Sequence, residues 1–173
     1  MTETAPLDPS FVADFAHRWL GAWNARDGDA VAALCTDDVL FFDPGLGEVV
    51  GRPAVSAWVA ACARAFPDYV FDEPEPPCLS PDRPKAIAPW RMRGTFTGSI
   101  EPPGFSPTGR TFELEGVDHW WFRDGLVERY RADYDSLGLL RQLGLMPARG
   151  SEAEKGLAAA QRAAAWAMTQ LKR

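Results

Sequence analysis

Large aromatic residues recur at helical spacing near the start of the chain. Four of them stand four positions apart: Phe11, Phe15, Trp19 and Trp23. This spacing places four rings along one face of a helix. Asp8-Pro9-Ser10 is a suitable N-terminal cap for it. The pattern predicts a helix that ends near residues 24–28, followed by a short second helix over residues 30–35 that completes a hairpin.

The next two segments change from an extended to a helical pattern. Residues 39–43 are rich in β-branched and aromatic side chains and stop at Pro44-Gly45, which predicts a strand that runs into a turn. After Gly51, apolar residues return at helical spacing as far as Phe66. We therefore expect a third helix with one buried face.

Long strand patterns separated by proline-rich connections fill the second half of the chain. The expected strands cover residues 86–97, 110–122 and 126–134. Arg123-Asp124-Gly125 is a hairpin turn signal between the last two. Helices followed by a meander of strands predict an α+β domain, with helices on one face of a curved antiparallel sheet and a pocket between the layers.

The C-terminal segment has a different composition. After Gly150 the sequence is rich in alanine and has high helix propensity, but it offers few large apolar anchors. We expect one domain over residues 1–149 and an appended helical extension over residues 150–173.

The strand around Asp118 alternates between two kinds of side chain. Asp118, Trp120 and Phe122 share one face, while the opposite face presents polar residues together with Trp121. The first face is expected to line the pocket. A reversed register, with Asp118 in solvent, is the alternative. An exposed Trp121 indicates a homodimer that associates through the outer face of the sheet.

Three segments carry a resemblance to a known superfamily. Trp23-Asn24-Ala25-Arg26-Asp27, continuing to Asp37-Asp38-Val39-Leu40-Phe41-Phe42-Asp43-Pro44, and Val117-Asp118-His119-Trp120 resemble ketosteroid isomerase. Ser136-Leu137-Gly138-Leu139-Leu140-Arg141-Gln142-Leu143-Gly144 is more similar to polyketide cyclases. Over residues 11–147 the chain thus resembles the nuclear transport factor 2-like superfamily, in its SnoaL-like and ketosteroid isomerase-like branches. The resemblance implies a cone-shaped fold around a hydrophobic pocket.

The resemblance also implies roles for individual residues. The general base of the isomerase falls on Asp43, and its oxyanion-hole aspartic acid falls on Asp118. Its oxyanion tyrosine falls on Trp19, whose indole N–H donates a hydrogen bond but is not an acid. The alternative for Asp43, directly before Pro44-Gly45, is a turn residue that bonds its own backbone.

Two other mechanisms are similar to this chain to a lesser degree. Epoxide hydrolases and aldol-type cyclases place an aspartate on the last strand, where this sequence has Ala132. The neighbouring Asp133 would serve only if a bulge turned it inward, because adjacent strand residues face opposite sides.

An apolar ligand would contact large side chains on the pocket wall. The candidates, for each of which a plain core role is the alternative, are Trp19, Trp23, Trp58, Phe66, Trp90, Met92, Trp120, Tyr130 and Tyr134. With acid and base aspartates among them, we expect an enzyme that isomerises or cyclises an apolar carbonyl or polyketide-like molecule. A non-catalytic small-molecule-binding protein is the rival hypothesis.

The composition limits which classes of partner the protein is expected to bind. The formal net charge of −6 argues against nucleic acid and anionic membranes as partners. The start of the chain lacks the pattern of a secretory signal, and three cysteines with irregular spacing indicate buried thiols, so a cytoplasmic protein is expected. The sequence contains no phosphate-binding glycine loop and no cluster of suitably spaced histidines, so we expect neither a cofactor nor a metal.

Overall fold

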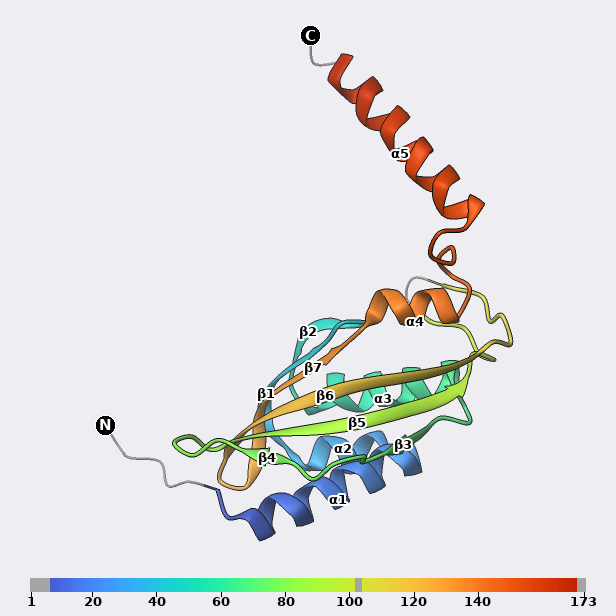
Figure 1. Cartoon of the computed structure of the whole chain (residues 1–173). Helices are drawn as coiled ribbons and strands as arrows, with labels where there is room; N and C mark the ends of the chain where they lie inside the picture. Colours follow the sequence, from blue (N-terminus) through green and yellow to red (C-terminus); the bar gives the residue numbers. More distant parts are fainter. Residues whose placement is uncertain (1–6, 102–103, 171–173) are drawn as a thin grey trace.

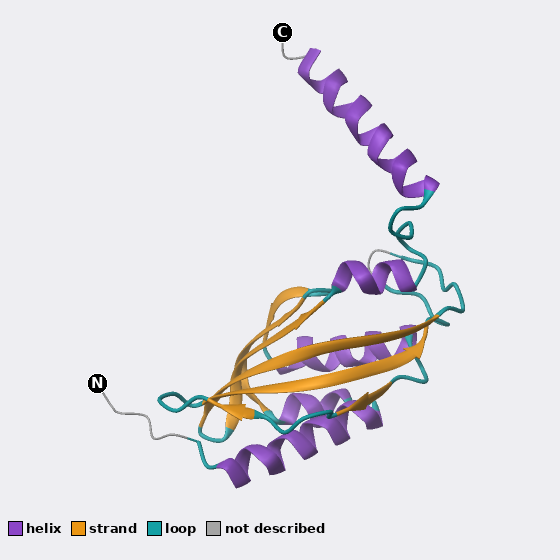
Figure 2. Cartoon of the chain, viewed as in Figure 1, coloured by secondary structure: helices purple, strands orange, loops and turns teal. Residues whose placement is uncertain are grey.

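The computed structural model describes residues 7–101 and 104–170, and it is built from one curved sheet with helices on one of its faces (Figures 1 and 2). The covering helices are α1 (Pro9–Ala25), α2 (Gly28–Ala33) and α3 (Arg52–Ala65). This is the α+β architecture that the order of the sequence patterns predicts, with a curved, unclosed sheet.

Local hydrogen bonds set the bounds of the first two helices. The Asp8 side chain accepts from the backbone N–H of Ser10 at 2.8 Å and caps α1. Arg26 ends this helix in the left-handed region, at φ 59°. Asp27 then accepts from the N–H of Ala30 and caps α2. Because of this cap, α2 begins two residues earlier than the sequence pattern predicts.

The sheet has the order β2-β1-β7-β6-β5-β3, and a short strand β4 also pairs with β5. In chain order the strands are β1 (Cys35–Asp43), β2 (Gly47–Val50), β3 (Val70–Asp72), β4 (Cys78–Leu79), β5 (Lys85–Thr95), β6 (Thr111–Arg123) and β7 (Leu126–Tyr134). β1 and β7 run parallel, and all other pairs are antiparallel. The three long strands are confirmed, whereas β2, β3 and β4 are too short to have been recognised.

The turn between β6 and β7 fixes which residues face the helices. Asp124 and Gly125 have φ values of 52° and 78°, as the central residues of a tight hairpin turn of the kind expected there. In the resulting register Asp118 lies opposite Ala132, and both side chains are buried. The alternative register, with Asp118 in solvent, is therefore wrong.

Aromatic packing joins α1 to the sheet. Phe15 is fully buried and packs edge to face against Trp120 and Phe122, with centroid distances of 5.2 and 4.8 Å. Burial of rings of this size dominates core energetics. The first half of the helical stripe, Phe11 and Phe15, thus packs in the core against the sheet.

Two further helices follow the sheet. α4 (Ser136–Gln142), which the sequence patterns did not predict, lies at one end of the sheet, and α5 (Glu152–Gln170) projects away from the rest of the molecule (Figure 1). No described residue of α5 is buried. The ion pair between Arg141 and Glu154, 2.7 Å, joins the two helices. The division of the chain at residue 150 stays a prediction.

The cysteines differ in environment. Cys35 is buried, Cys62 is half-buried and Cys78 is exposed, and none is in a disulfide. The expectation of three buried thiols is thus wrong for Cys78, which lies on the short strand β4. Within residues 7–101 and 104–170, no helix combines the length and the hydropathy needed to cross a membrane.

Candidate functional site

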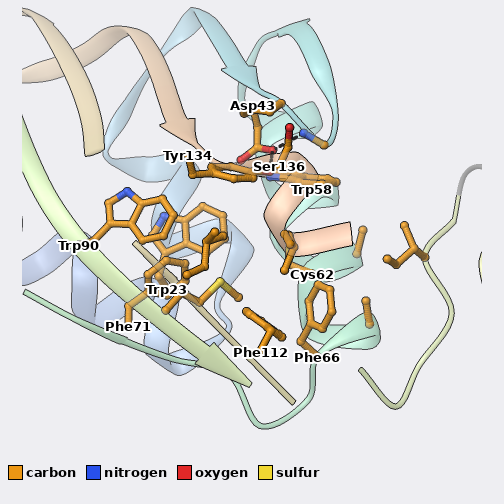
Figure 3. Close-up of a pocket in the computed structure, with 18 of the residues that line it drawn as sticks. Trp23, Asp43, Trp58, Cys62, Phe66, Phe71, Trp90, Phe112, Tyr134 and Ser136 are labelled. Carbon is orange, nitrogen blue, oxygen red and sulfur yellow. Dashed lines mark hydrogen bonds between the residues drawn. The ribbon is translucent and has the colours of Figure 1, made fainter. Parts of the chain in front are cut away.

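A cavity of about 340 Å³ lies between the helices and the inner face of the sheet. Side chains from α1, α3, α4 and the long strands line it, and Figure 3 shows several of its aromatic rings gathered below Asp43. Both expected catalytic residues, Asp43 and Asp118, are among the lining residues. So are eight of the nine expected ligand-contacting residues: Trp19, Trp23, Trp58, Phe66, Trp90, Met92, Tyr130 and Tyr134.

Trp120 is the exception. Its side chain is 1% exposed and lies outside the cavity, packed against Phe15 and Trp19 of α1. It is on the inward face of β6, as expected, but it is two residues nearer the β6–β7 turn than Asp118, where helix α1 closes over the sheet. Inward orientation on a strand therefore does not distinguish the cavity wall from the core.

Asp118 is enclosed by three hydrogen-bond donors. Its Oδ1 accepts from Nε1 of Trp90 at 2.7 Å and from the hydroxyl of Tyr130 at 2.8 Å. Its Oδ2 accepts from Nε1 of Trp19 at 3.0 Å. Burial raises the pKa of this carboxyl to about 7, although the three donors act in the opposite direction. Asp118 is thus divided between its neutral and charged forms near neutral pH.

A glycine allows one of these donors to reach the carboxyl. Gly116 lies opposite Trp90 in the β5–β6 ladder, and a Cβ atom at position 116 would lie 2.3 Å from the Trp90 ring. The indole therefore lies across the backbone of β6, where its N–H can bond Asp118. A larger residue at 116 would displace this ring.

Asp43 stands at the end of β1 and has two donors on one oxygen. Its Oδ1 accepts from the backbone N–H of Gly45 at 2.7 Å and from the hydroxyl of Tyr134 at 2.8 Å. The first of these is the turn bond expected from the alternative, structural role. However, the side chain is also 8% exposed and lines the cavity, and burial raises its pKa. The structural role and a role in the cavity are therefore compatible.

The two carboxyls affect each other. The negative charge of Asp43 also raises the pKa of Asp118, which places the two groups within electrostatic reach. Within the described residues no lysine, arginine or histidine lines the cavity. Simultaneous ionisation of both carboxyls is thus disfavoured. The arrangement favours a state in which one carboxyl is neutral while the other is charged.

The last strand, β7, does not supply an inward-facing aspartate. Ala132 faces inward opposite Asp118, and Asp133 lies on the outer face, where it pairs with His119 at 3.1 Å and Arg131 at 2.7 Å. The irregularity in the β6–β7 ladder lies between Trp121 and Phe122, too far along to turn Asp133 inward. The bulge that an epoxide hydrolase or aldol-type mechanism requires is not formed there.

Sequence reasoning missed several lining residues. Phe112 and Leu114 alternate in phase with Asp118, and Cys62 follows Trp58 by one helical turn, so periodicity could have identified all three. Ser136, Leu139, Leu140 and Leu143 come from α4 and the residue after it, which had no local signal. Among the described residues, no group of three or more potential metal ligands is present.

Solved structures of other proteins share this fold. TsrD from Streptomyces laurentii is 24% identical, with a TM-score of 0.70 over 81% of this chain and 99% of that chain. A candidate SnoaL-like polyketide cyclase from Jannaschia sp. CCS1 is 18% identical, with a TM-score of 0.69 over 80% and 94%. A protein of Catenulispora acidiphila DSM 44928 with a ketosteroid isomerase-like fold, in complex with trimethylamine, is 17% identical, with a TM-score of 0.63 over 76% and 92%.

These identities are low enough that the likeness establishes the fold alone. No curated protein matches the chain. A sequence family does: residues 16–130, more than half of the chain, match the SnoaL-like domain. This range begins in α1 and ends in β7, so it contains the two buried carboxyls, Asp43 and Asp118, and most of the rings around them. The chain belongs to the SnoaL-like domain family.

Proposed function

We propose that this protein is a cofactor-independent enzyme that isomerises or cyclises an apolar carbonyl or polyketide-like molecule by moving a proton within the cavity. The observation that supports this most directly is the pair of buried carboxyls, Asp43 and Asp118, on the wall of one largely aromatic cavity. Perturbed carboxyls in a cavity are typical of acid–base sites. The proposed roles are Asp43 as base and Asp118 as hydrogen-bond donor.

Asp43 suits the role of base because one of its oxygens is available. Its two donors, Gly45 and Tyr134, both bind Oδ1. Oδ2 accepts no hydrogen bond from the described residues, although the indole N–H of Trp58 lies close enough to the carboxyl to lower its pKa. Because burial raises the pKa, the carboxylate is a stronger base than an exposed aspartate. In the proposed reaction, Oδ2 takes a proton from the carbon next to the carbonyl and returns it elsewhere on the ligand.

Asp118 suits the role of donor when it is protonated. Oδ1 already accepts two hydrogen bonds and Oδ2 accepts one, so the acidic proton is best placed on Oδ2. From there it can be donated to the oxygen of an enolate that forms as Asp43 removes the proton. The two indoles cannot replace it as acids, because an indole N–H only donates a hydrogen bond.

Exchange of carbon-bound hydrogen tests this proposal without knowledge of the natural substrate. The bicyclic ketone 2-tetralone is incubated with the protein in D₂O, and loss of the α-proton signal is followed by NMR. We expect faster exchange than in buffer, and a loss of about 10²-fold or more in Asp43→Asn. The control is Asp133→Asn, which removes a carboxylate from the outer face and is expected to exchange like the wild type. Exchange at the buffer rate would favour a binding protein.

The alternative function is non-catalytic binding of a small molecule. It is favoured by the hydrogen bonds that give both carboxyls a structural role, including the Asp43 turn bond to Gly45. A protein with the same fold has been solved in complex with trimethylamine, so such a fold can hold a small ligand. A bound ligand that is recovered chemically unchanged, together with no exchange of 2-tetralone, would support this alternative.

We also propose a cytoplasmic homodimer that associates through the outer face of the sheet. The three cysteines are free thiols, as in a reducing compartment. On the outer face, Trp121 lies between Lys85 and Arg129, whose cationic groups are 4.4 and 5.0 Å from the ring centroid. Sedimentation that gives a dimer mass at micromolar concentration, and a monomer mass in Trp121→Glu, would support this arrangement. A monomeric wild type would contradict it.

A further inference from the structure

The charged side chains that line the cavity are all acidic. They are Asp43, Glu101 and Asp118, and no basic side chain joins them within residues 7–101 and 104–170. The remaining titratable groups of the lining are Cys62, Tyr130 and Tyr134, and burial raises the pKa of each, so they are neutral. Only negative charge can therefore develop in the cavity, with no protein cation there to balance it.

The groups that bond the two buried carboxyls are themselves neutral. Asp118 receives two indole N–H groups and one phenol hydroxyl, and Asp43 receives a backbone N–H and a phenol hydroxyl. A buried carboxylate without a counter-ion is costly. A positively charged ligand would remove part of this cost, whereas an anionic ligand would add to it.

One acceptor is available for such a ligand. Asp43 is more than nine-tenths buried, yet no described residue makes a hydrogen bond of good geometry to its Oδ2. Nε1 of Trp58 points towards this carboxyl and lowers its pKa, but it lies outside hydrogen-bond geometry and has no other partner among the described residues. Figure 3 shows Asp43 next to Tyr134, Ser136 and Trp58 on the cavity wall. A ligand atom at this place would contact a carboxylate oxygen and aromatic rings together.

The walls supply the second element of cation recognition. Four of the lining residues are tryptophans: Trp19, Trp23, Trp58 and Trp90. The negative face of an indole attracts a cation, and the attraction is stronger where water is excluded. From the aromatic walls, the unpaired Asp43 oxygen and the absence of a basic lining residue, we infer that the cavity binds a hydrophobic organic cation, a protonated amine or a quaternary ammonium. Its charged nitrogen lies at Asp43, and its apolar part lies against the rings.

This inference goes beyond the proposed proton transfer, because it concerns the charge of the ligand and depends on binding alone. A cation at Asp43 occupies the proposed base, so it also inhibits that reaction in competition with a neutral ketone. The titratable groups that face Asp43 are Asp118, Cys62, Tyr130 and Tyr134, from β6, α3 and β7. Since the carboxyls must ionise to attract the cation, its affinity rises with pH.

A pair of probes that differ in charge but share their shape tests the inference. Phenyltrimethylammonium and the uncharged tert-butylbenzene are titrated into the full chain, with tryptophan fluorescence as the readout. Benzenesulfonate is the anionic probe. At pH 8 we expect the cation to bind roughly tenfold or more tightly than tert-butylbenzene, and the sulfonate not to bind. The cation preference decreases at pH 5.5, because Asp118, whose pKa is about 7, takes up a proton between the two pH values and the negative charge in the cavity falls.

Two variants test whether the preference for the cation depends on Asp43. Asp43→Asn is expected to reduce the affinity ratio of cation to tert-butylbenzene to near one, while Asp133→Asn, which removes the same charge on the outer face, keeps it. A wild-type ratio at or below one at pH 8, no cation binding at millimolar concentration, or an unchanged ratio in Asp43→Asn would each overturn the inference. If exchange of 2-tetralone depends on Asp43 but no cation preference is found, the proposed reaction is supported and only the inference of a cationic ligand is rejected.

Discussion

The indole N–H of Trp19 donates a hydrogen bond to Oδ2 of Asp118 at 3.0 Å and thereby joins α1 to β6. Trp19 stands where the resemblance to ketosteroid isomerase implies a tyrosine. The exchange turns an acid into a group that only donates to the carboxyl. The phenol near Asp118 comes instead from β7, as Tyr130.

Removal of this donor should destabilise the charged form of Asp118. In Trp19→Phe the ring is largely kept and Oδ2 loses its one hydrogen bond. We expect the pKa of Asp118 to rise further and the free energy of unfolding at pH 8.5 to fall by about 1.5–3 kcal/mol, with a smaller loss at pH 5.5. Urea unfolding at both pH values checks this. Trp120→Phe is the matched control, because this buried indole lies outside the cavity and its N–H has no partner among the described residues. Equal losses of stability at both pH values would contradict the view that the Trp19 N–H stabilises the charged form of Asp118.

The two carboxyls should respond differently to the same substitution. In Asp43→Asn the amide oxygen can replace Oδ1, which accepts both hydrogen bonds, and the new NH₂ takes the place of the unbonded oxygen. In Asp118→Asn the NH₂ must meet an indole N–H, because each oxygen faces one. We expect Asp118→Asn to cost about 1–3 kcal/mol more than Asp43→Asn, measured by urea unfolding at pH 7. Equal costs would mean that the donors around Asp118 rearrange.

The stability of the protein should fall as the pH rises through neutrality. The pKa of Asp118 is raised from 3.8 to about 7, so between these values the native state holds a proton that the unfolded state has lost. This contribution is complete below pH 3.8 and is lost as the pH rises through 7. Between pH 5 and pH 8 the loss is roughly 2–3 kcal/mol. Asp118→Asn, although less stable, should show a flatter profile, and a wild-type profile that rises over this range would contradict the shift.

Gly116 should be required for the hydrogen bond between Trp90 and Asp118. A methyl group at 116 would overlap the Trp90 ring, so Gly116→Ala forces the indole away from the carboxyl. We expect destabilisation of about 1–3 kcal/mol and a changed near-ultraviolet circular dichroism signal. Gly156→Ala is the control, because nothing lies within 4 Å of the atom it adds on α5. A Gly116→Ala protein as stable as wild type would show that the ring can shift without cost.

The sequence predicts the elements of this fold better than it predicts the limits of its site. Strand alternation places Asp118 inward, and helical spacing places Trp19 towards it, because each depends only on local periodicity. The same periodicity points Trp120 inward as well, yet α1 covers that position and leaves it in the core. Which inward residues reach the cavity depends on where the helix closes over the sheet, and that is a matter of three-dimensional packing.

The sequence patterns also do not predict the hydrogen-bond donors around the carboxyls. Trp90, Tyr130 and Trp19 lie on three separate elements, and their N–H and O–H groups converge on Asp118 only in the folded chain. Ser136 and the leucines of α4 were missed because a short helix that contains Gly138 has no clear pattern of its own. The resemblance to polyketide cyclases was the one signal in that segment.

The segment after residue 150 should be dispensable for folding. No described residue of α5 is buried, and Glu154 links the helix to the rest of the chain through its ion pair with Arg141 and a hydrogen bond from the backbone N–H of Gly150. Such a half-exposed pair contributes little, so deletion of residues 151–173 should lower the free energy of unfolding by less than about 1 kcal/mol. Glu154→Ala, which breaks the same ion pair in the full chain and leaves the hydrogen bond from Arg141 to Pro147 in place, is the matched control and should show a similar loss. Urea unfolding and phenyltrimethylammonium binding are measured for both proteins. A truncated chain that unfolds, or that loses a binding activity that Glu154→Ala keeps, would show that α5 belongs to the domain and would move the boundary beyond residue 150.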